Sequence, residues 1–449
     1  MIKKIALMSL VLSQLAISCS SDDSSDGNTT ETEQSLSEQI ANIVKQPYSK
    51  LSPADQKTKL EAEANEMLVQ LDKTKNLSAL ETIENLNRLL DISTPDIFSG
   101  LNDNEAEDII NTAGVYGIYT WNNTEETWIK TSSTSELKFV FPAKESQTAN
   151  NASFSTNSVS SDIKVAVEDS YNWQTDTQTN DYFFLPTSAD AVLTIDNVKA
   201  ATFSQNAKYT NGNETPNEFG YKMSLNDGYS WEISSKKASE NTAKALFAYN
   251  GKNLIEFNSG STANIDELLQ GDALAQYRGK ANGLITLMDN FVIVAEMDFA
   301  AEAADKAALK TSNVYPEYPD NTDPNSDFKA FFNAENAYRK KLSEGTVAND
   351  NKNMKLILVS KKDGTKIADI VQRSESDGTD QITLPVWSAD DNFWYNWTDE
   401  GEAFTKQYYT EVSYLKFGDN TEVEMGVYFS TGFDTFKSKF DDFIQSFQK

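Results

Sequence analysis

A change in the period of the apolar residues near residue 115 limits the fold more than any other feature. Before that point apolar side chains recur every three or four residues, and after it they alternate with polar ones. VYGIYTW, ELKFVFPA and DIKVAVE, which begin at residues 115, 136 and 162, show the alternation. A period of two is typical of a strand with one buried face, whereas steps of three and four indicate an amphipathic helix. The chain therefore predicts helices first and a β-sheet afterwards.

Short turn motifs indicate that the sheet is antiparallel. Asp-Gly or Asn-Gly pairs occupy residues 227–228, 250–251 and 363–364, and Gly-Asp-Asn occupies residues 418–420. Such turns connect neighbouring antiparallel strands. The last two lie inside MKLILVSKKDGTKIADIV and YLKFGDNTEVEMGVYF, which predict strand pairs. We expect a large antiparallel sheet, with a curved or half-barrel form among the alternatives.

One tract in this region predicts something other than a strand. Residues 146–161 are rich in Ser, Thr and Asn and contain few side chains that a core would bury. Low complexity of this kind is typical of exposed connections. We therefore predict a long exposed loop there.

Helix start signals precede the sheet. Ser35 and Glu38 have the spacing of a capping box, Ser52 stands before Pro53, and a third helix is expected from Ser78. Residues 104–113 predict a weaker helix that ends at a glycine. The apolar stripes of these helices are interpreted as packing faces.

Two helical segments are expected within or after the sheet, and a third at the end of the chain. Residues 297–310 are rich in alanine, and residues 326–343 contain several aromatic side chains. Near the C-terminus five phenylalanines follow one another in steps of three and four: Phe433, Phe436, Phe440, Phe443 and Phe447. This spacing places the five rings on one helix face. The stripe predicts a helix docked on the sheet or, alternatively, the wall of an apolar cavity.

The N-terminus has the layout of a secretory signal. Lys3 and Lys4 precede an apolar stretch over residues 5–17. That stretch is too short to span a bilayer, which needs about 20 apolar residues. A charged start, a short apolar middle and small residues before a break are typical of an exported protein.

Residues 15–19 (LAISC) resemble the lipobox of bacterial lipoproteins, although Ala16 stands where that family usually has Leu. Residues 20–23 (SSDD) resemble the acidic tract that follows the cysteine in surface-exposed lipoproteins of the Bacteroidota. The resemblance implies that Cys19, the only cysteine in the chain, is acylated and anchors the protein to the outer membrane, exposed at the cell surface. Several acyl chains together hold a protein firmly to a membrane.

The predicted organisation has six parts in an α+β fold. They are a lipoprotein signal peptide (residues 1–18), a flexible acidic tether (19–34), a helical region (35–113), an antiparallel β region (114–300), a helical insertion (301–350), and β-hairpins with the Phe-striped helix (351–449).

Composition excludes several functions. The formal net charge is −29, and no run of Lys and Arg offsets it, so the chain is not expected to bind nucleic acid. The absence of histidine from all 449 residues excludes Ser-His-Asp and Cys-His catalysis. We find no phosphate loop or dinucleotide motif, and we expect no cofactor.

A calcium loop is also not expected. Residues 323–327 (DPNSD) have side-chain oxygens at alternate positions, like the start of an EF-hand. Phe328 stands where that loop needs glycine, and Ala334 stands where it needs the bidentate glutamate. We therefore predict neither a metal site nor identifiable catalytic residues.

The candidate ligand site is an aromatic cluster in WSADDNFWYNWTDEGE, which begins at residue 387. Trp387, Trp394, Tyr395 and Trp397 are its proposed ligand-binding residues. Aromatic faces stack on sugar rings, and the neighbouring acids can accept hydroxyl protons. The alternative is an inward-facing cluster with a solvated acidic rim, since Trp and Asn alternate as in a half-buried strand.

These observations favour a lipid-anchored, non-enzymatic surface protein that binds a partner, with a glycan as one candidate ligand. The second hypothesis is a carrier of an apolar ligand such as a lipid, held between sheet and helices. The third is a hydrolase that uses carboxylates alone, as glycosidases do.

Replacing Cys19 with alanine tests the anchor. We expect Cys19→Ala to abolish labelling with radioactive fatty acid and to move the protein from the membrane fraction to the soluble fraction. If the variant still takes up the label and sediments with membranes, the anchor hypothesis is wrong.

Overall fold

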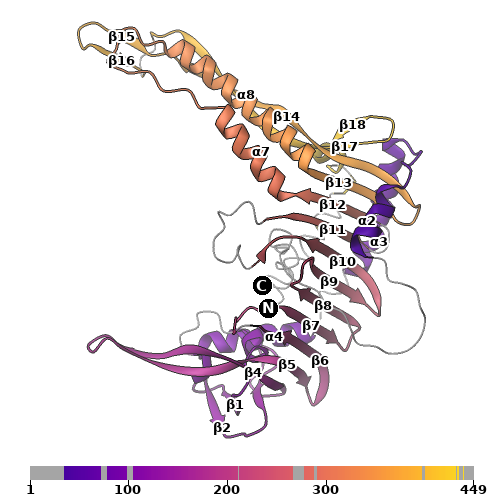
Figure 1. Ribbon diagram of the computed structural model, residues 1–449. Coiled ribbons are helices and arrows are strands. Elements are labelled where there is room, and N and C mark those ends of the chain that lie inside the picture. Colours follow the sequence, from indigo (N-terminus) through magenta and orange to yellow (C-terminus); the bar gives the residue numbers. More distant parts are fainter. Residues whose placement is uncertain are drawn as a thin grey trace.

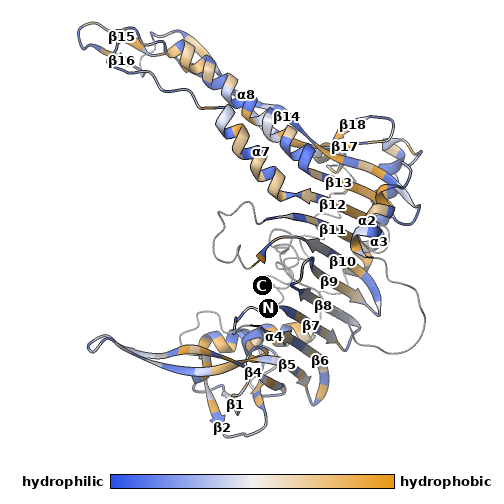
Figure 2. Ribbon diagram, in the orientation of Figure 1, coloured by the Kyte–Doolittle hydropathy of each residue, from blue (hydrophilic) through white to orange (hydrophobic). Residues whose placement is uncertain are grey.

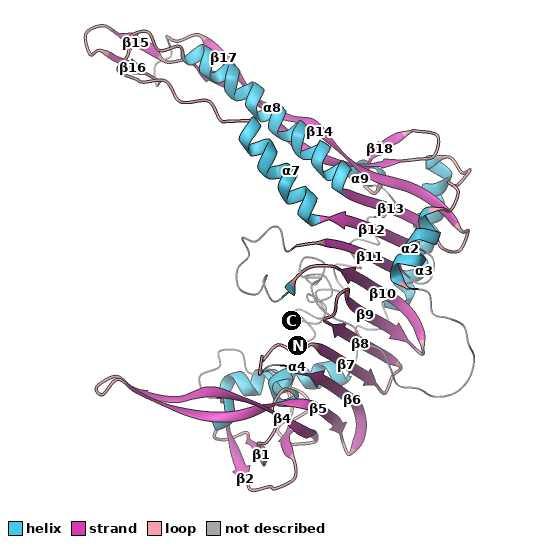
Figure 3. Cartoon of the chain, in the orientation of Figure 1, coloured by secondary structure: helices cyan, strands magenta, loops and turns pink. Residues whose placement is uncertain are grey.

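A mostly antiparallel sheet of 16 strands dominates the computed structural model (Figure 1). The structure describes residues 35–71, 78–98, 105–210, 212–265, 278–287, 291–396, 400–430, 432–433 and 438. Helices pack against the sheet, as Figure 3 shows. The α+β class and the large antiparallel sheet are thus confirmed, and the sheet does not close into a barrel.

The strands of the first half are β1 (Gly117–Asn122), β2 (Thr127–Thr131), β3 (Leu137–Phe141), β4 (Ala152–Asn172), β5 (Thr177–Ile195), β6 (Val198–Lys208), β7 (Glu218–Leu225), β8 (Tyr229–Lys236) and β9 (Asn241–Tyr249). Those of the second half are β10 (Lys252–Ser261), β11 (Lys280–Leu287), β12 (Phe291–Asp298), β13 (Met354–Ser360), β14 (Thr365–Thr383), β15 (Val386–Ser388), β16 (Phe393–Tyr395), β17 (Ala403–Lys416) and β18 (Glu422–Glu424). The helices are α2 (Leu36–Val44), α3 (Pro53–Leu71), α4 (Ser78–Ile92), the 3₁₀ turn η2 (Asp96–Phe98), α5 (Ala106–Ile110), α7 (Phe299–Ser312), α8 (Phe328–Asn353) and α9 (Met425–Tyr428).

From β3 to β14 every strand pairs with the next one along the chain. β17 then pairs with β14, and the short strands β15 and β16 form a separate hairpin between them. The four predicted hairpin turns are confirmed, because each lies between two paired strands. The strand predicted after residue 420 is shorter than expected, since it ends at Glu424 and α9 follows.

The prediction of an exposed loop over residues 146–161 is wrong from residue 152 onward. β4 begins at Ala152 and pairs with β3 on one side and β5 on the other. Phe154 and Thr156 are buried, and the Ser153 hydroxyl forms a hydrogen bond with that of Thr194 at 2.8 Å. Small polar residues alternate with buried ones here, and threonine favours strands, so low complexity did not exclude backbone pairing.

One face of the sheet is apolar and lies under helices. α4 and α5 bury Leu86, Leu90 and Ile109 against Phe154 and Phe203, among other side chains. The same apolar face continues through the partly buried Leu287 to a second cluster, which α3 and α9 cover. Figure 2 shows hydrophobic and hydrophilic residues alternating along the strands.

The other face is polar over β6–β10 and apolar over β11–β13. Cross-strand ion pairs such as Lys222–Glu232 and Lys244–Glu256 occupy the polar part. Over β11–β13, α2 packs Ile40 against a cluster that contains Val294. These strands therefore have apolar residues on both faces, which explains their nearly continuous apolar sequences.

Two extensions leave the central sheet (Figure 1). One is the β4–β5 hairpin, and the other is formed by β14 and β17 with α8 packed along them. Residues 297–310 and 326–343 were predicted as helices, and α7 and α8 confirm both, with α8 continuing to Asn353. Within the described residues, no helix is long and apolar enough to cross a membrane.

Only the first residue of the phenylalanine stripe is described. Phe433 is buried and contacts Phe429, with 5.0 Å between the ring centroids. The other four phenylalanines, Phe436, Phe440, Phe443 and Phe447, lie outside the described residues. Whether they form a packing face or a cavity wall therefore stays a prediction.

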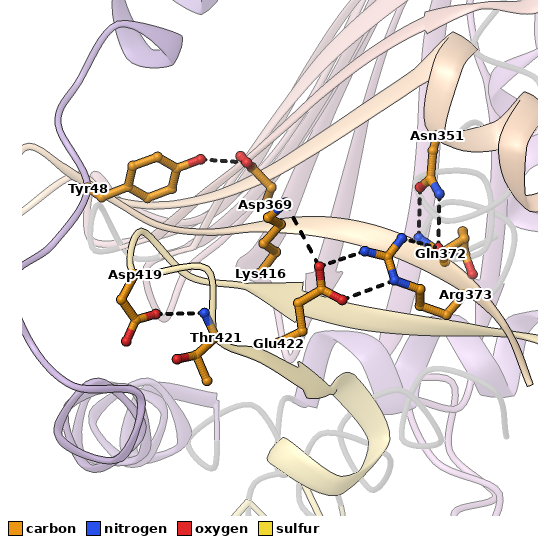
Figure 4. Close-up of polar contacts among 9 residues, drawn as sticks. All are labelled: Tyr48, Asn351, Asp369, Gln372, Arg373, Lys416, Asp419, Thr421 and Glu422. Carbon is orange, nitrogen blue, oxygen red and sulfur yellow. Dashed lines mark hydrogen bonds and ion pairs between the residues drawn. The ribbon is translucent and has the colours of Figure 1, made fainter.

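The segment between α2 and α3 is fixed to the second half of the sheet (Figure 4). The Lys366 N–H donates to the carbonyl of Pro47, and the Tyr48 hydroxyl donates to the Asp369 carboxylate. Burial and this bond to Asp369 raise the pKa of Tyr48 to about 12, so the hydroxyl stays a donor at neutral pH. A Cβ on Gly418 would lie 2.5 Å from that of Tyr48, which explains the glycine in the Gly-Asp-Asn turn.

Leu86 and Ile92, which both lie on α4, provide a test of this core. Leu86→Ala should lower the free energy of unfolding by about 2–5 kcal/mol, because it leaves a cavity in a fully buried site. Ile92→Ala, on the same helix but 47% exposed, should change it by less than about 0.5 kcal/mol. Urea unfolding followed by circular dichroism measures both. Equal effects would mean that α4 does not pack as described.

Candidate functional site

A polar cleft lies where β10–β13 meet the start of α7 and the end of α8. Its volume is about 740 Å³, within the range of about 300–1,000 Å³ that is usual for small-molecule sites. Most of the residues that line it are polar or charged, and none of them is aromatic. In this it differs from the usual apolar ligand pocket.

The strand register builds the floor of the cleft. Gly260, Asn282, Glu296 and Lys355 form one row across β10, β11, β12 and β13, each directly opposite the next. Residues that face each other in an antiparallel sheet point to the same side. Four residues that are far apart in the sequence are therefore side by side in the cleft.

The walls come from three helices. Ser37, in the first turn of α2, accepts a hydrogen bond from the Asn282 amide at 3.2 Å. Lys352 and Asn353, at the end of α8, both donate to the Asp305 carboxylate of α7, at 2.8 and 2.7 Å. These bonds fix the two helices to each other at the rim.

The lining contains equal numbers of positive and negative side chains, although the chain as a whole is strongly acidic. It contains three lysines and three carboxylates: Lys280, Lys352, Lys355, Glu240, Glu296 and Asp298. Asp298 caps α7 by accepting from the Ala301 N–H at 3.0 Å, and it pairs with Lys280 at 3.1 Å. The Ala301 N–H and Lys280 together hold the pKa of Asp298 below its usual range. Asp298 is therefore charged at neutral pH.

One acceptor on the floor of the cleft has no partner among the described residues. A Cβ on Gly260 would lie 2.6 Å from Asn282 Oδ1 and 3.2 Å from Glu240 Oε1, so a larger residue at this position would force the Asn282 side chain to move. Asn282 Oδ1 is buried and has no hydrogen-bond partner among the described residues. A buried acceptor without a partner is costly, and a ligand hydroxyl or a water molecule would satisfy it.

The predicted aromatic site lies elsewhere, at the outer end of the α8 extension. Trp387 and Trp394 form a cross-strand pair in the β15–β16 hairpin, with ring centroids 5.8 Å apart. Both are half-buried. Tyr395 is on the opposite face of the hairpin and contacts Phe393. Trp397 lies outside the described residues, as does Cys19.

Trp394 is engaged in packing. Its ring lies 5.3 Å from that of Phe328, and its indole N–H donates to the carbonyl of Asp323 at 2.9 Å. The structure thus brings Trp387 and Trp394 together but places Tyr395 apart from them. This arrangement favours the inward-facing alternative for Trp394.

The buried carboxylate of Glu335 is structural. It accepts from Arg339 at 2.7 Å and from the Tyr315 hydroxyl at 2.8 Å, and it pairs with Lys406. Burial alone would raise its pKa, but these three partners hold the pKa below its usual range. Glu335 therefore fixes α8 to β17. Across the part of the chain that the structure describes, no three His, Cys, Asp or Glu side chains are grouped to hold a metal.

The sequence alone did not reveal the cleft, because its residues come from seven elements and share no motif. The one local signal is Gly260, a glycine inside an alternating strand, which often marks a close approach to the backbone. Comparison with protein-family models, curated proteins and solved structures finds no significant match.

Trp394→Ala should lower the free energy of unfolding by about 1–3 kcal/mol, because it removes the contact with Phe328 and leaves a carbonyl without its donor. Tyr395→Ala, on the other face, should change it by less than about 0.5 kcal/mol. Chemical unfolding followed by circular dichroism compares the two. Unchanged stability in Trp394→Ala would restore the surface-patch interpretation.

Proposed function

We propose that the chain is a lipid-anchored surface protein of the outer membrane that binds a neutral glycan in the polar cleft without catalysis. The observation that supports this is the row of polar side chains on the cleft floor, in which Asn282 Oδ1 is an acceptor without a partner among the described residues.

Sugar hydroxyls donate and accept hydrogen bonds, so they are complementary to amines and carboxylates that lie next to each other. Lys280 and Asp298 form such a pair, and Asn282 Oδ1 is an unused acceptor. The balanced lining disfavours a ligand of strong single charge, and the net charge of −29 disfavours polyanions. A neutral, hydroxyl-rich ligand fits these conditions best.

The charge state of Asp298 fits ligand binding better than general-acid hydrolysis. A carboxylic acid that donates a proton in glycoside hydrolysis needs a raised pKa. The pKa of Asp298 is lowered instead, because the carboxylate accepts from the Ala301 N–H and pairs with Lys280. Asp298 therefore orients a ligand as a charged acceptor.

The anchor and the cleft are close in sequence. Ser37, at the rim, follows the end of the proposed tether by three residues. A 16-residue flexible tether reaches on the order of 20 Å. An acylated Cys19 would thus hold the cleft near the membrane surface.

Two glycines on neighbouring strands provide a matched test that leaves the charge unchanged. Gly260→Ala places a methyl group on the cleft floor, whereas a Cβ on Gly283 meets only ordinary contacts at 3.6 and 3.7 Å. We expect Gly260→Ala to weaken retardation in gels that contain neutral polysaccharides by about tenfold in apparent Kd, or about 1.4 kcal/mol. Gly283→Ala should migrate like the wild-type protein.

A second variant guards against a folding defect. Glu296→Gln keeps the shape of the side chain and removes one charge from the floor row. Because this changes the mobility of the protein itself, retardation is measured relative to the same variant in a gel without polysaccharide. We expect this retardation to be weaker than that of the wild-type protein. Thermal unfolding of each variant shows whether the fold is intact. If both folded variants bind like the wild-type protein, the cleft is not the glycan site.

A further inference from the structure

The outer part of the β4–β5 hairpin stands apart from the rest of the sheet. β3 pairs with β4 only over residues 152–156, and β6 pairs with β5 only over residues 188–195. Among the described residues, 165–172 of β4 and 177–183 of β5 pair only with each other. At about 3.3 Å per residue, this ribbon extends by roughly 25 Å.

The ribbon ends in an exposed tryptophan. Trp173 is 78% exposed, more than any other large apolar side chain in the described chain, and Tyr171 beside it is 54% exposed. Isolated two-stranded ribbons are marginally stable in water. A long ribbon with an indole at its end is thus a costly arrangement unless the indole binds something.

Hydrogen bonds within the turn hold the tip in place. The Asn172 side-chain oxygen accepts from the N–H groups of Gln174 and Thr175, at 3.0 and 3.3 Å. The Tyr171 hydroxyl donates to Asp176 at 2.6 Å. The tip is therefore ordered before it meets a partner, which lowers the entropic cost of binding.

The groups around Trp173 are amides, hydroxyls and acids. Asn172, Gln174 and Thr175 are all exposed next to the indole. Between residues 162 and 181 there are five acidic residues and one lysine, and Lys164 lies over the Tyr182 ring at 3.8 Å. This acidic field repels phosphate, sulfate and carboxylate groups, and hence anionic membranes and polyanionic chains.

We propose that the ribbon tip binds a neutral glycan, with a sugar ring stacked on Trp173 and its hydroxyls bonded to the neighbouring amides. The inference rests on the proposed function and adds a second contact for the same class of ligand. A protein partner fits less well, since a stable protein interface buries about 800 Å² on each side and surrounds its anchors with groups that exclude water. Here the Trp173 indole and the Tyr171 ring stand among polar groups, which is a small apolar area for a protein interface.

The test is native gel electrophoresis of the purified mature protein in gels that contain amylopectin, xylan or galactomannan, with polygalacturonate as the anionic comparison. Trp173→Ala should weaken retardation by a neutral polysaccharide about three- to tenfold, the range of one aromatic contact. Trp173→Phe should keep most of it, because a ring remains. Val314→Ala, at a site that is 76% exposed, should have no effect.

Each failure has its own pattern. If Trp173→Ala is retarded like the wild-type protein while Gly260→Ala is not, the tip inference is wrong and the proposed function stands. If no neutral polysaccharide retards the wild-type protein, both are wrong. Retardation by polygalacturonate alone would overturn the neutral ligand for both sites.

Discussion

Backbone pairing of consecutive antiparallel strands is the constraint on which the rest of this structure depends. Because each strand from β3 to β14 pairs with its sequence neighbour, the sheet grows in one direction without closing. Open antiparallel sheets commonly bury one face and expose the other to solvent. α4, α5, α3 and α9 cover the apolar face, while ion pairs and α2 occupy the opposite face in the part of the chain that the structure describes. The cleft forms on that opposite face, where α2 ends its cover and the strands meet α7 and α8.

Local signals predicted a large part of this fold. The capping box at Ser35 and Glu38 is present, and the four turns predicted from Gly, Asp and Asn connect paired strands. Such features depend on neighbours within a few residues, so one sequence contains them. The strand at residues 152–161 was missed because its pairing depends on β5, more than 20 residues away. A serine-rich composition shows that a segment has little apolar surface to bury. It does not exclude a strand, because backbone pairing does not need large side chains.

The candidate sites likewise divide into those that local sequence predicts and those that depend on the three-dimensional structure. The tryptophans of the β15–β16 hairpin were found from the sequence because they are close together in it, yet Trp394 packs against α8. The cleft was missed because the register of four strands brings its floor together. Trp173 was missed for a different reason. A single tryptophan in a sequence does not predict a binding site, because the length of the ribbon and the exposure of its tip are seen only in the structure.

The same register links stability to the cleft. Leu284, Val294 and Ile357 form the row next to the cleft floor, on the same face, and pack under α2. A slip of one residue in any of these strands would move the apolar residue of that strand to the other face, together with its polar floor residue. The apolar contacts of Ile40 therefore hold the strands in the one register that aligns Asn282, Glu296 and Lys355. Packing under α2 and the geometry of the cleft therefore both depend on the same strand register.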